Sequence, residues 1–533
     1  MTACTGRQIP DWLDVAARSH PDKLALSFAG RRWTFAELRG SVAATAAVLS
    51  NVRAESTGRI GILSANRLGV VFAVHAATRI SVPFVPLNWR QTASELAWQL
   101  RDAGITVLIV DEERATVAKT ACDDLPVTVV PIAELERSHP PVENSDESSW
   151  IDLEREATVI YTSGTSGRPK GARITYGNLW FSAIASALHL GHHPEDLWLA
   201  AMPLFHVGGL AILFRGVIGA IPVILHEQFE PERVLTAIDD GVTLLSVVPT
   251  MLQRMIDARG DARWSPSLRR VLLGGSAAPP RLVEECGRRG IPVAPTYGLT
   301  EATSQVTTLL PDQTPHKRSS SGLPLPLTEL RIVTETGVAP SGEIGEIEIR
   351  GPTIFAGYVG DDTAASRNLA DGWFRTGDAG YLDRDGYLYV VDRRDDLIIS
   401  GGENVYPAEL EQVLRDHPSV LDAGVVGVPD ESWGSRPVAA VVWRGDPDRA
   451  RLDLLHHAVQ DPGSISAPRR AAEVTVGEVA SWRPTPDDQR IVGTNGGRDL
   501  NNSVLDSHEI RCHRGQACVQ NTHHLINLVS VDN

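Results

Sequence analysis

The chain has 533 residues, of which 42% are hydrophobic and 22% charged, as in soluble globular proteins. This length is too great for one ordinary core, so we expect two or more domains. With 50 Lys and Arg against 66 Asp and Glu, the net charge of −16 argues against binding to nucleic acid or to an anionic membrane surface. No signal peptide and no apolar run of about 18 residues is visible, and the cysteines are scattered. We therefore expect a cytoplasmic protein without a membrane span.

The first part of the chain alternates helix and strand signals. Thr34 and Glu37 form a capping box ahead of a helix whose apolar positions are 38, 42, 46 and 49. Buried strands are predicted over 60–63, 82–87, 107–110, 244–248 and 271–273, with helices ending near 79 and covering 95–102. Strands interleaved with helices predict α/β subdomains with a mostly parallel sheet.

A different pattern begins near residue 343. Residues 344–350 alternate between apolar and polar side chains, as in a strand. Asp385-Gly386 joins two β-rich runs, 379–382 and 387–391, as a hairpin. A compact α+β piece follows, with a helix over 407–415 and strands near 423–428 and 438–443. We expect a large N-terminal part of α/β subdomains with a small β-rich subdomain, followed by a small α+β domain.

Residues 161–171 read Tyr-Thr-Ser-Gly-Thr-Ser-Gly-Arg-Pro-Lys-Gly and predict a phosphate-binding loop. Glycines let the backbone amides approach an anion, hydroxyl groups add donors, and Lys170 adds a positive charge. The pattern is not Walker A, because Lys170 lies three residues after Gly167. The alternative is a flexible polar loop, which the density of glycine and hydroxyl residues disfavours. The phosphate-binding candidates are Thr162, Ser163, Gly164, Thr165, Ser166, Gly167 and Lys170.

This loop resembles the signature of the adenylate-forming superfamily of acyl-CoA synthetases, luciferases and peptide-synthetase adenylation domains. Three later segments resemble its other motifs: Tyr-Gly-Leu-Thr-Glu at 297–301, Trp-Phe-Arg-Thr-Gly-Asp at 373–378, and residues 392–407. The resemblance implies that Tyr297 stacks on adenine, Thr300 meets the α-phosphate and Glu301 holds Mg²⁺. Gly275 and Ser276 join the expected nucleotide site. From the residues alone, Glu301 is equally well an acid in the first turn of a helix.

The resemblance also implies roles for the second part of the chain. Asp378 is expected to accept hydrogen bonds from the ribose and Arg393 to contact it, although Asp378 also suits a turn. Asp395 is the expected hinge, and Gly401 and Gly402 line the entry for CoA. We accordingly expect an adenylation domain over 1–392, the start of a mobile C-terminal domain over 393–445, and a divergent tail over 446–533.

The pocket segments bear on the acid that is activated. His206 stands where amino-acid-activating members carry an Asp, so an α-amino acid is disfavoured. Residues 201–213, 272–279, 297–305 and 398–404 resemble the 2-succinylbenzoate–CoA ligases of menaquinone biosynthesis, whose substrate has two carboxylates. Ser304, His206 or Arg215 could pair with the second carboxylate, and Gly274 would line the pocket. The alternatives are that His206 only gates the pocket and that Arg215 lies on a solvated helix face.

One departure from the superfamily concerns a lysine. Members carry a Gly-Lys near the end of the C-terminal domain for adenylation, but no lysine follows Lys317, and Arg483 is the nearest candidate. A frameshift or altered gene end would explain this, and so would a divergent appendage; we favour the first.

We expect an acid–CoA ligase using ATP, Mg²⁺ and CoA. The alternatives are another fatty-acyl or aryl-CoA synthetase, or a nucleotide-binding pseudoenzyme. The oligomeric state stays open, with a homodimer as one compatible arrangement.

Overall fold

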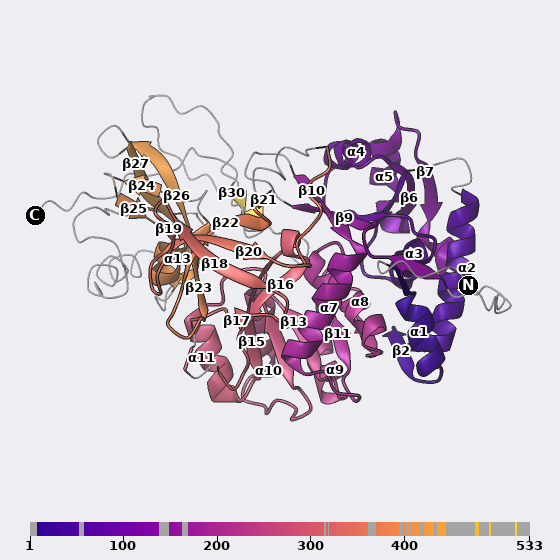
Figure 1. Ribbon diagram of the computed structural model, residues 1–533, viewed down its shortest axis with the longest axis horizontal. Coiled ribbons are helices and arrows are strands. Elements are labelled where there is room, and N and C mark those ends of the chain that lie inside the picture. Colours follow the sequence, from indigo (N-terminus) through magenta and orange to yellow (C-terminus); the bar gives the residue numbers. More distant parts are fainter. Residues whose placement is uncertain are drawn as a thin grey trace, which may run out of the picture. The chain divides into compact units, whose positions relative to one another are not determined.

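A computed structural model describes residues 8–52, 58–137, 149–162, 169–313, 316–317, 319–360, 369–393, 398–400, 403–405, 407–415, 420–430, 434–443, 475–478, 490–491 and 518–519. The chain forms two compact units (Figure 1). The first comprises Met1–Glu343, Glu348–Thr376 and Leu382–Tyr389, and the second Ile344–Ile347, Gly377–Tyr381 and Val390–Asn533. Among the described residues, no helix is both long and apolar enough to cross a membrane.

The first sheet of unit 1 has the strand order β10-β9-β5-β4-β6-β7, parallel throughout except for the antiparallel edge strand β10. Its strands are β4 (Arg59–Leu63), β5 (Phe84–Pro86), β6 (Ile105–Val110), β7 (Thr128–Pro131), β9 (Glu156–Thr162) and β10 (Lys170–Thr175). Its helices include α2 (Phe35–Val52), α3 (Leu68–Arg79), α4 (Ala93–Asp102), α5 (Ala115–Cys122) and α6 (Ile132–Glu136). The predicted capping box is confirmed, since the Thr34 amide donates to Glu37 and the Glu37 amide to Thr34.

The second sheet has the order β17-β16-β15-β14-β13-β11-β12-β2-β3, with antiparallel strands only at its two edges. Its strands are β2 (Leu24–Phe28), β3 (Arg31–Thr34), β11 (Trp198–Ala200), β12 (Val223–Leu225), β13 (Leu244–Val247), β14 (Arg270–Leu273), β15 (Val293–Leu299), β16 (Ser304–Thr308) and β17 (Leu323–Pro324). The helices are α7 (Tyr176–Leu190), α9 (Pro231–Asp239), α10 (Pro249–Arg259) and α11 (Pro280–Arg289). The predicted mostly parallel α/β sheet is confirmed.

Helix α8 (Val207–Ile218) is part of a core that both sheets share. It packs against α1 (Trp12–Ser19), α7, β11 and β12 (Figure 1). Every residue from Gly209 to Val217 is buried, and the same core cluster includes Ile60 of β4 and Trp198 of β11. A helix that is apolar all round is expected in such an interior position. Any polar side chain on it therefore needs a specific explanation.

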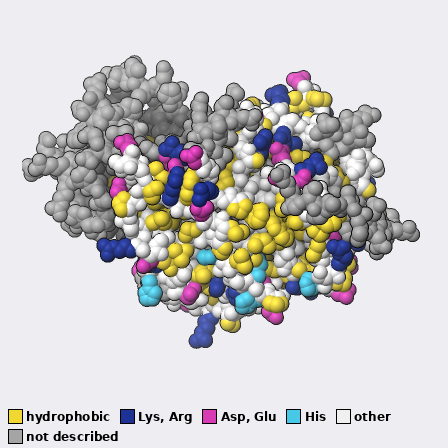
Figure 2. All heavy atoms as spheres, in the orientation of Figure 1, with side chains coloured by type: hydrophobic (Ala, Val, Ile, Leu, Met, Phe, Trp, Pro, Cys, Tyr) yellow, Lys and Arg dark blue, Asp and Glu magenta, His cyan; other side chains and the backbone are white. Residues whose placement is uncertain are grey.

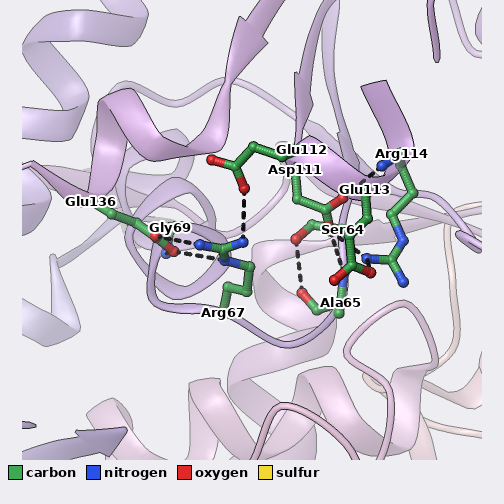
Figure 3. A network of polar contacts seen from close by, with 9 residues as sticks. All are labelled: Ser64, Ala65, Arg67, Gly69, Asp111, Glu112, Glu113, Arg114 and Glu136. Carbon is green, nitrogen blue, oxygen red and sulfur yellow. Dashed lines mark hydrogen bonds and ion pairs between the residues drawn. The ribbon is translucent and has the colours of Figure 1, made fainter. Parts of the chain in front are cut away.

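A polar network fixes the turns that follow β4 and β6 (Figure 3). The buried carboxylate of Asp111 accepts from the Ala65 amide at 3.1 Å and from the Arg114 guanidinium at 3.0 Å. Arg67 donates to both oxygens of Glu136. Charge-assisted bonds of this kind are stronger than neutral ones, so they hold the Ser64–Arg67 turn in one conformation.

The β-rich part carries paired charges on its surface. The β18 (Glu329–Thr334) side chain Arg331 pairs with Glu348 of β20 (Gly345–Arg350) at 2.6 Å. The Arg331 guanidinium also lies over Trp373 of β22 (Trp373–Leu382), 4.1 Å from the ring centroid. Figure 2 shows basic and acidic side chains interspersed on this face, and hydrophobic side chains gathered over the region of α7. The remaining short strands of unit 1 are β1 (Gln8–Pro10), β8 (Trp150–Asp152), β19 (Gly337–Val338) and β21 (Leu369–Ala370).

Unit 2 has its own small core. Strands β24 (Ile398–Ser400), β25 (Glu403–Val405), β26 (Val420–Asp430), β27 (Gly434–Trp443) and β28 (Thr475–Glu478) form one sheet, on which α13 (Pro407–Arg415) packs. Strand β23 (Leu388–Arg393), like β20 and β22, contributes residues to both units, and β29 (Arg490–Ile491) pairs with β30 (Cys518–Val519). Leu410 and Leu414 of α13 share a buried cluster with Val425 and Val441. The predicted helix over 407–415 is confirmed.

Candidate functional site

The candidate site lies at the carboxyl ends of the parallel strands in the second sheet. Strands β11, β13, β14 and β15 all run in one direction, and β11, β14 and β15 each lead into a segment that the sequence singled out. These segments are 201–206 after β11, 274–276 after β14 and 297–304 at the end of β15. Ligands of open α/β sheets bind outside this edge, because the connecting loops meet there. The topology therefore gathers the predicted pocket segments at one edge.

A hairpin holds the two ends of the predicted phosphate loop. Thr162 ends β9, Lys170 begins β10, and the two residues face each other in the antiparallel register. Lys170 is half-buried. The loop residues Ser163, Gly164, Thr165, Ser166 and Gly167 lie outside the described residues. The hairpin therefore fixes the position at which the Lys170 backbone leaves the loop.

The second predicted motif forms a tight turn at the end of β15. Tyr297 is on the strand, and Thr300 and Glu301 open the short 3₁₀ helix η2 (Thr300–Ala302). The Glu301 Oε1 atom accepts a hydrogen bond from the Tyr358 hydroxyl at 2.8 Å. The Lys170 Nζ atom lies 5.5 Å from the centroid of the same Tyr358 ring. The structure thus brings the predicted lysine and the predicted metal ligand to one tyrosine.

Backbone strain follows directly after this turn. Thr303 and Ser304 have φ angles of 56° and 105°, which residues other than glycine rarely adopt. Thr303 is held by its own hydroxyl, which donates to the Thr353 carbonyl at 2.8 Å, and by the Ser182 hydroxyl, which donates to the Thr303 carbonyl at 2.8 Å. A Cβ atom at Gly298 would lie 1.8 Å from the Ser304 carbonyl oxygen. Such strain is typical of functional sites that the surroundings over-determine.

The segment after β14 requires glycine. Gly275 has a φ of 81°, and a Cβ atom on Gly274 would lie 2.7 Å from the Thr296 side chain. The Gly274 amide donates to the Val247 carbonyl at 3.2 Å, which ties β14 to β13. Ser276 is half-buried beside this turn. The backbone at Gly274 and Gly275 can therefore approach a ligand closely without an intervening side chain.

Arg215 is the charged residue on the buried helix α8. It is 2% exposed, and its Nη2 atom donates to Ser304 Oγ at 3.3 Å. Its guanidinium carbon lies 5.4 Å from the centroid of Trp198. Burial lowers the Arg215 pKa to about 10, so the group stays charged at neutral pH. In the part of the chain that the structure describes, Arg215 has no ion-pair partner and its Nε atom has no hydrogen-bond partner. The interpretation of a solvated helix face is wrong.

His206 precedes α8 and is exposed. The surrounding protein nevertheless desolvates the imidazole. This desolvation, together with the smaller effect of the positive charge of Arg90, lowers the His206 pKa to about 4. An exposed but partly desolvated ring is expected for a side chain that lines a recess. Arg215 lies nine positions after His206, the N-cap of α8, which corresponds to a rise of ~13.5 Å along the helix axis. The two side chains therefore belong to different ends of this helix.

Asn66 fixes the segment before His206, and the sequence reasoning missed it. Its side-chain amide donates to the carbonyls of Met202 and His226, at 2.9 and 3.1 Å, and its oxygen accepts from the Leu204 amide at 2.9 Å. A buried asparagine with three such bonds connects the first sheet to the loop of the second. Its position after β4 carried no signal in the sequence.

The remaining predicted residues belong to the second part of the chain. Asp378 lies on β22 and is 9% exposed, so it is not a simple surface turn residue. Arg393 ends β23. The predicted hinge Asp395 and the predicted CoA-entry residues Gly401 and Gly402 lie outside the described residues.

Comparison with known proteins bears on this arrangement. Residues 13–359 match the model of the AMP-binding enzyme family, and residues 409–478 match the model of the AMP-binding enzyme C-terminal domain. The chain belongs to the AMP-binding enzyme family. The family match over 13–359 spans all the site segments of unit 1 described above. The predicted superfamily and its fold of α/β subdomains followed by a small α+β domain are confirmed.

Curated relatives in this family include 2-succinylbenzoate–CoA ligases. The protein of Geobacillus kaustophilus (strain HTA426) is 45% identical over 447 residues, which cover 83% of this chain and 90% of the relative. That of Bacillus mycoides (strain KBAB4) is 41% identical over 439 residues, which cover 82% and 89%.

Among solved structures, the o-succinylbenzoate CoA synthetase of Bacillus subtilis in complex with the acyl-adenylate intermediate OSB-AMP has a TM-score of 0.80 at 38% identity, covering 88% of this chain and 94% of that one. The same enzyme with ATP and magnesium ion has a TM-score of 0.80 at 37% identity, covering 88% and 96%.

Proposed function

We propose that this chain is an ATP-dependent acid–CoA ligase that forms an acyl-adenylate and then a thioester, and that its acid is 2-succinylbenzoate. The class of reaction follows from the family and from relatives that are 2-succinylbenzoate–CoA ligases. One observation carries the choice of acid: Arg215 is a buried cation without an acidic partner among the described residues. Such a group favours a substrate that brings a second carboxylate of its own.

The adenylation step needs positive charge around the phosphates. When a carboxylate attacks the α-phosphorus, negative charge grows on the phosphorus oxygens and on the leaving pyrophosphate. Lys170 and the amides of the loop at 163–168 would hold the outer phosphates, and Thr300 would donate to the α-phosphate. Each aimed donor in a site sheltered from water is worth roughly 2–4 kcal/mol. Tyr297, Gly275 and Ser276 would bind the adenosine side of the nucleotide, with Asp378 and Arg393 on the ribose.

Glu301 fits the role of a magnesium ligand. Magnesium prefers carboxylate oxygens, and one Glu301 oxygen, Oε2, accepts no hydrogen bond from the described residues. Glu301 would hold the ion, which would supply positive charge to offset the negative charge of the phosphates. Tyr358 already holds the other oxygen, so the carboxylate can present Oε2 in one direction.

The acid would lie between the strained turn and α8. Ser304 and Arg215 are in contact, so one carboxylate can receive a hydrogen bond from the hydroxyl and from the guanidinium together. His206 lies at the far end of α8 and would line the recess near the reacting carboxylate, with Gly274 along its wall.

Thioester formation is assigned to the second part of the chain. We propose that a pivot at Asp395 exposes the acyl-adenylate to CoA along a path beside Gly401 and Gly402. A domain movement between half-reactions is a common form of gating. The C-terminal domain would begin at 393. The family match and strand β28 reach residue 478, so the divergent tail that the sequence placed at 446–533 would begin after residue 478. Adenylation would be slowed by roughly two to three orders of magnitude for want of the Gly-Lys lysine. A cytoplasmic location is part of the proposal, and a homodimer is compatible with it.

Thioester production from 2-succinylbenzoate tests this function. The full chain and a version with a family-like C-terminal segment are assayed with ATP, Mg²⁺ and CoA, alongside a medium-chain fatty acid and a plain aryl acid. We expect a CoA thioester from 2-succinylbenzoate, formed faster by the repaired version. A preference for the fatty or aryl acid would assign the chain to those synthetases, and inactivity of both versions with every acid would favour a pseudoenzyme.

A further inference from the structure

The segment 351–359 joins two parts of the site that are far apart in the sequence. It runs beside β10, where the Val359 amide donates to the Gly171 carbonyl at 2.8 Å and the Arg173 amide to the Gly357 carbonyl at 2.9 Å. Phe355 also donates its amide to the Glu301 carbonyl at 2.8 Å. One short segment is thus bonded both to the strand that begins at Lys170 and to the turn that carries Glu301.

Tyr358 is the side chain at the centre of this segment. It is 7% exposed, and its ring packs edge-on against Phe355 at a centroid distance of 4.8 Å. Its hydroxyl donates to Glu301 at 2.8 Å, and its ring lies 5.5 Å from the Lys170 ammonium. The two contacts use different parts of one residue, the hydroxyl and the π-face.

We propose that Tyr358 is a positioning residue for adenylation, holding the Glu301 carboxylate in its metal-binding orientation and the Lys170 ammonium beside it. This inference rests on the proposed function, because it assigns Tyr358 to the ATP and magnesium site of that reaction.

The physical basis lies in what each contact restricts. The Glu301 carboxylate can rotate about its side-chain bonds. A hydrogen-bond donor fixed to one of its oxygens therefore sets the direction in which the other oxygen points. Groups that orient a metal ligand in this way typically change metal affinity or activity by ~10–100-fold when they are removed. Burial and the Glu301 carboxylate both raise the Tyr358 pKa, so the phenol keeps the proton that it donates. The ring contact attracts the lysine to a site that the backbone has already placed.

Two substitutions separate the two contacts. Tyr358→Phe removes the hydroxyl but keeps the ring, whereas Tyr358→Leu removes both. ATP binding to the full chain is measured by calorimetry, with and without Mg²⁺, so the readout does not depend on turnover. For Tyr358→Phe we expect Mg²⁺-dependent ATP affinity to fall by about 10-fold and affinity without Mg²⁺ to change by less than about 2-fold. For Tyr358→Leu both affinities should fall.

The experiment also includes a matched control variant and a double-mutant cycle. Tyr389→Phe removes another tyrosine hydroxyl that donates to a carboxylate, Asp383, at 3.4 Å, and it should leave both affinities unchanged. In a Glu301→Gln background, Tyr358→Phe should have no further effect if it acts through Glu301. Melting curves establish that each variant is folded; if Tyr358→Phe is not, Glu301→Gln and Tyr358→Leu are still compared.

The outcomes are distinct. Equal Mg²⁺-dependent affinity in the wild type and in folded Tyr358→Phe would overturn the positioning role, as would a full Tyr358→Phe effect in the Glu301→Gln background. If Tyr358→Phe does not fold, Mg²⁺-dependent affinity as high in Tyr358→Leu as in the wild type would do the same. If the wild type itself bound no ATP with Mg²⁺, the proposed function would fail instead.

Discussion

Replacing Arg215 by Met should make the free protein more stable and its acid binding weaker. The guanidinium is held charged in the core, and its pKa of about 10 lies more than two units below the ordinary value. At ~1.36 kcal/mol per unit, keeping this charge costs the folded state roughly 3 kcal/mol. The cost is present at every pH below about 10, because both folded and unfolded states are protonated there. Methionine fills similar space without charge, so we expect a gain of about 1–3 kcal/mol in the free energy of unfolding.

Acid binding should change in the opposite direction. A charge-assisted hydrogen bond contributes ~1.5–3 kcal/mol, so loss of the guanidinium should raise the KM for 2-succinylbenzoate by roughly 10–150-fold. The same acid without its ring carboxylate should be affected much less. Urea unfolding of the free protein and initial rates of thioester formation measure the two effects.

Arg269→Met is a control that should change the free energy of unfolding in the opposite direction. Arg269 pairs with buried Asp196 at 2.6 Å, so its loss leaves a carboxylate without its partner and should destabilise by about 3–5 kcal/mol with little effect on the KM. An Arg215→Met protein that was less stable than the wild type, with its KM unchanged, would refute the reasoning, since Arg215 would then be a structural residue.

Three further predictions concern single residues. Burial lowers the His75 pKa to about 4, so below pH 6.5 the unfolded chain binds a proton that the folded chain does not. The free energy of unfolding should therefore fall by ~2 kcal/mol from pH 7 to pH 5. In urea denaturation, the His75→Leu variant should lose ~2 kcal/mol less than the wild type over the same pH range. Gly298→Ala would place a Cβ atom against the Ser304 carbonyl and should lower the melting temperature sharply, whereas Gly287→Ala on α11, with open space around it, should raise stability by about 0.5–1 kcal/mol. His206, with a pKa of about 4, should stay neutral from pH 6 to 9, so a His206→Asn rate profile should keep the same inflections over this range; an inflection lost in the variant would contradict that assignment.

Local signals in the sequence predicted much of the fold. The capping box at Thr34 and Glu37 and the helix over 407–415 depend on residues within a few positions of each other, and both were confirmed. The motifs at 297–301 and around Lys170 were likewise readable, because the chemistry of a phosphate site requires particular residue types at short spacing.

Other parts of the site depend on contacts that no local pattern contains. Arg215 lies on a helix that is buried on every side, so hydrophobic periodicity could not tell which way its side chain faces. Tyr358 matters only because its segment pairs with β10 and reaches Glu301. The positive φ angles of Thr303 and Ser304 arise from neighbours such as Ser182 and Gly298, and nothing in Thr-Ser itself favours them.

The burial of α8 has a consequence for how substrate choice can change. In many enzymes specificity is set by surface loops, which accept exchange at small cost. Here the wall that would recognise the distal end of the acid is made of the same helix that joins the hydrophobic interiors of two sheets. A change of substrate at Arg215 is then also a change of interior packing, so variants with new acids should arise together with compensating substitutions in neighbouring strands and helices.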